Sequence, residues 1–488
     1  MGSVCSRNPV VINKTPFQIN EYSRNTDIRK KYEFVSILGS GSFGKVRLYR
    51  DRKCKGMKYA IKTLVKDGVT RNVLDYLISE VNILRSLDHP NIVKYYETFE
   101  DDYYVHIVME YLQGDDLYKL LVQQEKELKE KNVCDITRQL LKALSFIHKK
   151  NIVHRDIKPE NILFGQKDDY STLKLIDFGL ATTTKIKKGK NAVGSPYYMA
   201  PEIIKGQYSC KTDMWSVGVI LHLMLTGSFP FKGDREGGEN DLFYQILNTP
   251  FDPKKIEAAP FSEESKDMVK KLLVKDQSKR LSAEEALEHP WMTKFIRGNR
   301  KSTLINRDTL ETIKQFTMKT ALQKEILFFI AKITNESEVT RLREMFNQLD
   351  TTNSGTLTIA EIREAFHKLG HNISEEDINT IWKGLDFHQD GKINYTEFLA
   401  ATMSSLNFSR EEEIWSAFKY FEETEADKEG TISIESLFKA IRAFNISVNE
   451  EAIRKGFNEL ENKGKVLDFD VFKELVSCTN NPAESKVY

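Results

Sequence analysis

Cysteine is scarce in this chain of 488 residues, and its five positions are scattered and odd in number. Such spacing excludes a disulfide framework and a cysteine-based metal site, and it is typical of reduced thiols in a cytosolic protein. An excess of charge is missing as well, because 72 Lys and Arg residues stand against 71 Asp and Glu residues. No nucleic-acid partner is therefore expected from bulk charge.

Long apolar runs are also absent, since none approaches the roughly 20 residues that a membrane-spanning helix needs. With 40% hydrophobic residues, the chain still has enough apolar surface for about two to four domains. A single core of this size is not expected. Any membrane contact must therefore come from another feature of the chain.

The first six residues supply such a feature. Gly2, with Ser at the sixth position, matches the pattern for myristoylation, and Cys5 offers a palmitoylation site. Two lipid anchors predict a cytoplasmic protein that associates peripherally with a membrane, helped by the basic residues Arg29, Lys30 and Lys31. An unmodified tail is the alternative.

A glycine-rich segment is the first sign of chemistry. Residues 35–46 place Gly39, Gly41 and Gly44 between apolar residues, and glycines let backbone amides approach a phosphate closely. A P-loop is excluded because Val46 stands where that motif needs a magnesium-binding Ser or Thr. The β-branched and aromatic flanks predict a strand–turn–strand hairpin instead.

Polar motifs follow this loop in a fixed order. Phosphoryl transfer demands positioning and neutralisation of charge, which favours a lysine and magnesium-binding acids. The motifs are Lys62 in a strand pattern, Glu80 in a helical pattern, His154-Arg155-Asp156 with Lys158 and Asn161, Asp177-Phe178-Gly179, and Ala200-Pro201-Glu202. In this order they resemble the motifs of eukaryotic protein kinases, over residues 32–292.

The resemblance implies an α+β bilobal kinase fold. It also implies that Asp156 takes the proton of the substrate hydroxyl, that Lys158 steadies the transferred phosphoryl group, and that Glu80 orients Lys62 on the phosphates. Asn161 and Asp177 are expected to hold Mg²⁺. The expected ATP site comprises Leu38, Gly39, Gly41, Gly44, Val46, Ala60, Lys62, Glu80, Met109, Glu110, Asp116, Glu160, Asn161 and Asp177. Glu202 with Arg280, and Asp213, resemble architectural residues of the family.

Two features bear on substrates and control. Asp116 and Glu160 match positions where kinases meet basic residues before the target Ser or Thr, although each is equally well read as a solvated carboxylate. Residues 180–199 carry lysines but no Ser, Thr or acid in their middle, where a phosphate would pair with Arg155. Activation by loop phosphorylation is not expected, with Thr182–Thr184 as the remaining positions.

Calcium-loop patterns follow the kinase motifs. An EF-hand loop supplies oxygen ligands at fixed offsets, with Gly sixth and a bidentate Glu twelfth. Residues 350–361 fit, although their carboxylate count is low. The expected ligands are Asp350, Thr352, Ser354, Thr356 and Glu361.

Residues 386–397 form the second pattern. Asp386, Asp390, Lys392 and Glu397 are expected ligands, and His388 stands where an oxygen ligand is usual, a place that water can fill. For both loops the alternative is a helix–loop–helix without metal.

Two further loops are degenerate. Around 425–436, Ser436 replaces the bidentate Glu, and around 459–472 no register aligns acid, glycine and final Glu. Both keep an apolar residue at the loop centre, Ile432 in one and Val466 or Leu467 in the other. They are therefore expected to pair as a folded lobe with weak calcium binding or none.

Kinase, basic amphipathic junction and four EF-hand units in this order resemble the calcium-dependent protein kinases of plants and protists. The resemblance implies a lipidation segment (1–31), a kinase domain (32–292), an autoinhibitory junction (293–338), an all-α calmodulin-like domain (339–478) and a tail (479–488). It implies a monomeric, calcium-activated Ser/Thr kinase that uses ATP, Mg²⁺ and Ca²⁺ and acts on proteins. A kinase with a non-regulatory EF-hand docking domain and a catalytically silent scaffold are the alternatives.

Overall fold

The computed structural model describes residues 27–477, apart from the segments 42–43, 54–55, 67–70, 124–127, 184–193, 234–237, 296–306, 335–338, 369–373, 387, 404–410, 423–429 and 444–448. Gly2 and Cys5 lie outside the described residues. No helix among those that are described is long and apolar enough to cross a membrane.

The first lobe is an antiparallel sheet in the order β1-β2-β3-β5-β4. Strands β1 and β2 confirm the hairpin predicted for the glycine-rich segment. A Cβ on Gly44 would lie 2.2 Å from the carbonyl oxygen of Thr63 on the next strand, so only glycine fits there. The elements are η1 (Ile28–Lys30), β1 (Tyr32–Gly41), β2 (Gly44–Asp51), β3 (Lys58–Val65), α1 (Arg71–Ser86), β4 (Tyr95–Glu100) and β5 (Tyr104–Glu110).

The second lobe is mainly helical, and its other helices pack around α3 and α5. Helix α5 begins at a capping box on Ser209 and ends at Gly227, whose φ of +64° is a left-handed conformation that glycine adopts easily. The helices are α2 (Leu117–Gln123), α3 (Glu130–Lys149), α4 (Pro201–Ile204), α5 (Cys210–Thr226), α6 (Gly238–Asn248), α7 (Lys254–Ala258), α8 (Glu263–Leu272), α9 (Ala283–Leu287) and α10 (Pro290–Lys294).

Short elements between α3 and α4 carry the catalytic motifs. They pair as β6 with β9 and as β7 with β8. Their bounds are β6 (Ile152–Val153), η2 (Pro159–Asn161), β7 (Ile162–Phe164), η3 (Tyr170–Thr172), β8 (Leu173–Leu175), β9 (Thr182–Thr183) and η4 (Pro196–Tyr198).

The described part of the junction forms two helices, α11 (Arg307–Thr317) and α12 (Ala321–Ile333). Helix α12 packs on α16, α17 and α19, and α11 packs on α15 and α16, so both belong to the last domain. The remaining helices are α13 (Thr340–Leu349), α14 (Ile359–Lys368), α15 (Glu375–Leu385), α16 (Tyr395–Thr402), α17 (Glu411–Phe421), α18 (Ile434–Ala443), α19 (Glu450–Asn462) and α20 (Phe469–Ser477).

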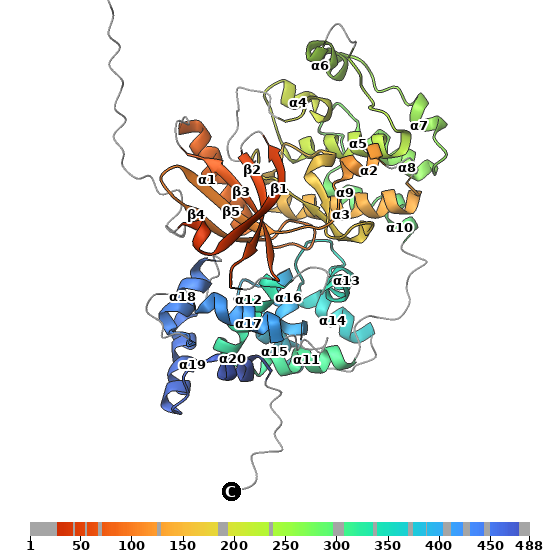
Figure 1. Ribbon diagram of the computed structural model, residues 1–488. Coiled ribbons are helices and arrows are strands. Elements are labelled where there is room, and N and C mark those ends of the chain that lie inside the picture. The colour runs from red at the N-terminus through yellow and green to blue at the C-terminus, as the bar shows by residue number, and fades with distance from the viewer. Residues whose placement is uncertain are drawn as a thin grey trace, which may run out of the picture.

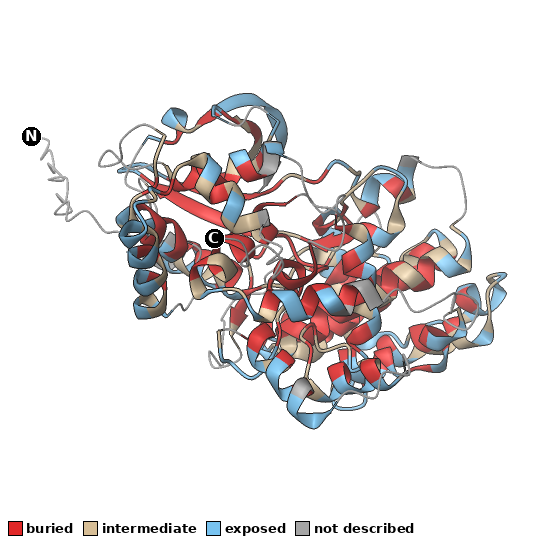
Figure 2. Cartoon of the chain, turned by 90° about the horizontal axis from the view of Figure 1, so that it is seen from below, coloured by how far each residue is buried: buried red, intermediate tan, exposed pale blue. Residues whose placement is uncertain are grey.

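Two apolar cores hold these parts together. One fills the kinase lobes around α3 and α5. The other joins the second face of the sheet, through Tyr59, Ile61 and Val108, to the junction and calmodulin-like helices. In Figure 1 those helices lie on one side of the sheet and of α3, and α4 and α6 lie on the opposite side. Figure 2 shows buried residues on the inward sides of the helices. The helices from α11 onward thus complete the burial of the sheet.

Candidate functional site

Lys62 is the centre of the phosphate-handling site. Its Nζ lies 2.6 Å from Glu80 Oε1 and 2.6 Å from Asp177 Oδ1. Strand β3 supplies the lysine, α1 supplies the glutamate, and the segment after β8 supplies the aspartate. The structure therefore brings together three residues that the sequence predicted as one group.

Electrostatics favour the charged forms of Lys62 and Asp177. Burial alone would lower the pKa of Lys62, but the carboxylates of Glu80 and Asp177 outweigh it and raise the pKa. Burial would raise the pKa of Asp177, whereas Lys62 lowers it overall. Burial raises the pKa of Glu80 despite the neighbouring lysine. A protonated Lys62 can therefore neutralise phosphate charge, and an ionised Asp177 can bind a cation.

The catalytic loop surrounds Asp156. Asn161 Nδ2 donates to Asp156 Oδ2 at 3.0 Å, and Lys158 Nζ lies 2.8 Å from the same oxygen. Ser195 Oγ donates to Asp156 Oδ1 at 3.1 Å and accepts from Lys158 Nζ at 3.1 Å. Sequence reasoning missed Ser195. Its place between Gly194 and Pro196, just before Ala200-Pro201-Glu202, is the signal that was available.

Asp213 holds the backbone of this loop. Its carboxylate accepts from the amides of His154 at 3.0 Å and Arg155 at 2.9 Å, and it lies 2.8 Å from His148 Nε2. Arg155 has a φ of +67°, a strained conformation for a non-glycine residue. The predicted bracing role of Asp213 is confirmed by these contacts.

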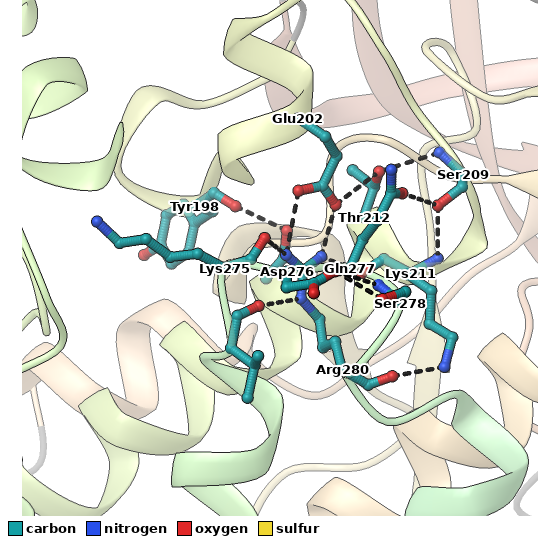
Figure 3. A network of polar contacts seen from close by, with 12 residues as sticks. Tyr198, Glu202, Ser209, Lys211, Thr212, Lys275, Asp276, Gln277, Ser278 and Arg280 are labelled. Carbon is teal, nitrogen blue, oxygen red and sulfur yellow. Dashed lines mark hydrogen bonds and ion pairs between the residues drawn. The ribbon is translucent and has the colours of Figure 1, made fainter. Parts of the chain in front are cut away.

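Glu202 and Arg280 form the buried ion pair that the sequence predicted. Arg280 Nη1 lies 2.5 Å from Glu202 Oε1, and Nη2 lies 3.0 Å from Oε2, a bidentate pairing. Figure 3 shows Thr212 bonded to the same glutamate and Lys211 bonded to the carbonyl of Arg280. The pair fixes α4 against the segment that follows α8.

The expected adenine side lies between β2, β3 and β5. Ala60 pairs with Met109 across β3 and β5, and Met109 is buried as a gatekeeper would be. Val46 lies opposite Lys62 in the β2–β3 register. Leu38 and Gly39 are exposed on β1, which leaves them free to cover a ligand.

Two predicted cleft residues have structural contacts. The Glu110 carboxylate accepts from the Lys94 amide at 2.6 Å and pairs with Lys174 at 3.2 Å. Asp116 Oδ1 accepts from the Lys119 amide at 2.8 Å and so caps α2. The side chain of Glu160, in contrast, is exposed.

The first calcium loop, 350–361, is folded around its own oxygens. Asp350 accepts from the amides of Ser354 at 2.7 Å and Gly355 at 2.9 Å. Glu361 Oε1 accepts from the Thr352 hydroxyl at 3.0 Å, and Ser354 Oγ donates to the Thr356 carbonyl at 2.7 Å. Carboxylate, hydroxyl and carbonyl oxygens are the donors that calcium prefers, so this set fits the ion.

In the second calcium loop, 386–397, the positions expected to supply ligands include His388, whose side chain offers nitrogen instead of oxygen. Asp386 accepts from the amides of Asp390 at 3.0 Å and Gly391 at 3.1 Å, as a calcium loop requires. His388 Nδ1, however, lies 2.7 Å from Glu397 Oε1. Burial would lower the pKa of His388, but Glu397 outweighs it and raises the pKa. The imidazole therefore engages the bidentate ligand.

His388 also connects this loop to the junction. Its Nε2 lies 3.8 Å from Glu325 Oε1 on α12, and its ring meets Phe328 edge to face at 4.9 Å. Burial raises the pKa of Glu325 to about 7. Among the described residues, no group of three or more Asp, Glu, His or Cys side chains is arranged so that it could hold a metal ion.

Short backbone bridges pair the loops. Leu357 and Ile393 bond to each other in the first pair, and Thr431 bridges Asp468 in the second. The Ile432 amide donates to the Leu467 carbonyl at 2.9 Å, and Leu467 is 2% exposed against 59% for Val466. Leu467 is therefore the apolar loop-centre residue. Residues 423–429 of the third loop lie outside the described residues.

Contacts between the kinase and the calmodulin-like domain are the largest feature that the sequence did not predict. Asp88, between α1 and β4, accepts from the Thr396 amide at 3.0 Å and hydroxyl at 2.9 Å. Glu97 on β4 accepts from the Tyr420 hydroxyl at 3.2 Å. Lys31, one of the three basic residues expected to help membrane association, pairs with Glu97 at 3.1 Å and lies 3.8 Å from the Tyr420 ring centroid.

Comparison with known proteins agrees with both halves of the chain. Residues 32–292 match the family described as protein kinase domain, and residues 339–403 match that described as EF-hand domain pair. The chain is 34% identical to calcium-dependent protein kinase 17 of Arabidopsis thaliana, over 93% of this chain and 85% of that protein. It is 33% identical to calcium-dependent protein kinase 11 of Oryza sativa subsp. japonica, over 93% of this chain and 77% of that protein.

Proposed function

Since this chain belongs to the calcium-dependent protein kinase family, we propose that it transfers the γ-phosphate of ATP to Ser and Thr hydroxyls of proteins when calcium binds its own EF-hands. The observation that carries the proposal is Lys62 held between Glu80 and Asp177, in one chain with a calcium loop whose donors are all oxygens. Neither alternative, scaffold or docking module, needs both features.

Each catalytic residue has a role that its contacts support. Lys62 binds phosphate oxygens, and Glu80 keeps it in place. Asp156 Oδ1 and Oδ2 already accept hydrogen bonds, so the carboxylate is oriented to receive the proton of a substrate hydroxyl. Lys158 lies beside it, where its charge steadies the transferred group. Asp177 and Asn161 would hold Mg²⁺, which neutralises phosphate charge when bound.

The proposal of calcium control is supported by where the junction helices lie. Helices α11 and α12 bury Ile313, Phe316 and Ile326 against the calmodulin-like helices, on the side of the kinase away from α4 and α6. We propose that this is the released arrangement, and that without calcium the junction 293–338 blocks the cleft. Calcium shifts the balance only through its preference for one state, and about 5.5 kcal/mol moves it from 1:99 to 99:1.

The N-terminal pattern supports a second, finer proposal. Gly2 and Cys5 would carry a myristoyl and a palmitoyl group, which together give stable anchoring where one chain gives only marginal binding. Mass spectrometry of the protein from its native cell tests both modifications. Partition to membranes should be lost in Gly2→Ala.

The decisive experiment measures phosphate transfer from Mg-ATP to a basic Ser/Thr peptide by the full-length protein, first in calcium and then in excess EGTA. Activity only in calcium supports the proposal. Equal activity in both would keep the kinase and make the EF-hand domain a docking module. Absence of activity in both, with ATP still bound, would make the protein a scaffold. Asp156→Asn is the matched control, because it should bind ATP and transfer nothing.

A further inference from the structure

Arg155, the residue before the proposed base Asp156, is a buried cation whose side chain, among the described residues, contacts a backbone carbonyl and an aromatic ring. It is 8% exposed. Its Nε donates to the Leu180 carbonyl at 2.7 Å, and its guanidinium carbon lies 5.0 Å from the centroid of the Tyr208 ring. The Tyr76 hydroxyl on α1 lies close enough to the guanidinium to oppose the lowering of the Arg155 pKa that burial causes. Asp213 contributes charge nearby but bonds the backbone amide of Arg155.

The activation segment offers no acid to this cation. Residues 184–193 read Thr-Lys-Ile-Lys-Lys-Gly-Lys-Asn-Ala-Val, which adds positive charge instead. Thr182 is buried in β9, where it pairs with Val153. A buried guanidinium without compensation is costly, so its other partners must stabilise it. An aromatic face attracts a desolvated cation most strongly, and a carbonyl and a hydroxyl can accept its protons.

These partners come from the three segments that build the site. Tyr76 lies four residues before Glu80 on α1, and residues at this spacing share one face of a helix. Leu180 directly follows Asp177-Phe178-Gly179, and Tyr208 precedes α5. Contacts to Arg155 therefore link the helix of Glu80, the segment of Asp177 and the second lobe.

We propose that Tyr208 and Tyr76 are positioning residues that hold Arg155 in place of a phosphate, so that Glu80 stays on Lys62 without phosphorylation of the activation segment. The ring of Tyr208 compensates the charge, and the hydroxyl of Tyr76 connects it to α1. This rests on the proposed kinase activity. It explains how a kinase with a basic activation segment leaves control to calcium.

The test compares Tyr208→Leu, Tyr208→Phe and Tyr76→Phe in the full-length protein with calcium. We expect Tyr208→Leu to lower kcat about tenfold, the equivalent of about 1.4 kcal/mol, with an unchanged KM for ATP. Tyr208→Phe keeps the ring and should restore most of that loss, and Tyr76→Phe should fall between. Tyr244→Leu, at an exposed tyrosine of α6, controls for the substitution itself.

A double-mutant cycle tests whether Tyr208 acts through Arg155. In an Arg155→Met background, Tyr208→Leu should cause no further loss, whereas additive losses would overturn the proposal. Loss of activity after phosphatase treatment, or full activity of Tyr208→Leu, would overturn it too. Hydrogen exchange of α1 should be faster in Tyr76→Phe than in wild type. This readout needs no catalysis, so failure of the kinase activity itself remains distinguishable.

Discussion

The two calcium loops, 350–361 and 386–397, share their offsets of acid, glycine and final glutamate but differ in what lies against them. The first faces the kinase, since a Cβ on Gly355 would lie 2.4 Å from the His89 ring and 2.8 Å from Phe146. The second has open space at Gly391, and its Glu397 meets His388 beside the junction residue Glu325. Both loops thus contact the kinase, the first at Gly355 and the second at Thr396, but they do so through different residues, and the second also meets the junction residue Glu325.

Removing both bidentate ligands should have the largest effect. Glu361→Gln with Glu397→Gln leaves each loop one charge short and with a poorer ligand, so calcium activation should be lost while ATP still binds. Transfer to a peptide with and without calcium, together with ATP titration, measures this. Glu376→Gln, at an exposed glutamate of α15, is the control. Full calcium activation of the double variant would refute the assignment of both sites.

The two loop glycines offer a matched pair for the next test. Their φ angles are +75° at Gly355 and +78° at Gly391, so an alanine costs a similar strain of about 1–2 kcal/mol at each. Only Gly355→Ala also collides with the kinase, and overpacking costs about 1–3 kcal/mol more. We expect calcium activation to fall about tenfold further in Gly355→Ala than in Gly391→Ala.

Calcium titrations of the two full-length variants separate docking from binding. Similar calcium affinities with different kinase activities would place the defect at the contact with His89. Equal activities of the two variants would show that the first loop has no closer connection to the kinase than the second.

In the second calcium loop, a substitution at His388 should make calcium activation more sensitive. His388→Asp replaces the imidazole at Glu397 with an oxygen ligand, and ligand charge tunes the affinity of EF-hand loops. The calcium concentration for half-maximal activation should fall by about threefold to tenfold, which is about 0.7–1.4 kcal/mol. His388→Ala removes the imidazole without adding a ligand and should change the midpoint less. A weaker response in His388→Asp would mean that water and histidine already serve the loop.

The phosphate-handling site could be predicted because its residues lie in motifs with fixed local spacing. Lys62, Glu80, Asp156 and Asp177 each belong to a short pattern, and their meeting follows from the fold that the patterns identify. The residues that lie against each of the two calcium loops could not be predicted. Asp88 and Thr396, separated by hundreds of residues, each look like an ordinary polar surface residue until the domains dock.

The same limit explains two finer outcomes. The partners of Lys31, which are Glu97 and Tyr420, come from elements far away in the sequence, so no local pattern around Lys31 indicated them. The sequence left open whether Val466 or Leu467 is the apolar residue at the loop centre. The answer depends on which backbone carbonyl accepts the Ile432 amide, and a pattern of apolar residues does not determine this. Every residue of β4 is buried, so both faces of this strand are covered, although three of its six residues are polar and the sequence therefore gives no apolar signal for it.

Loss of the contact between Asp88 and Thr396 should give the smallest effect, and it tests whether calcium activation depends on the contact of the second loop with the kinase. Thr396→Val removes only the hydroxyl bond, while Asp88→Asn weakens both bonds by removing the charge. Hydrogen bonds to a charged group contribute about 1.5–3 kcal/mol, but other contacts share the interface, so we expect about a threefold loss of maximal activation. A double-mutant cycle should give non-additive losses, because both changes act on one contact. Additive losses would mean that the two residues act independently, and calcium activation would then depend on the kinase contact of the first loop and not on that of the second.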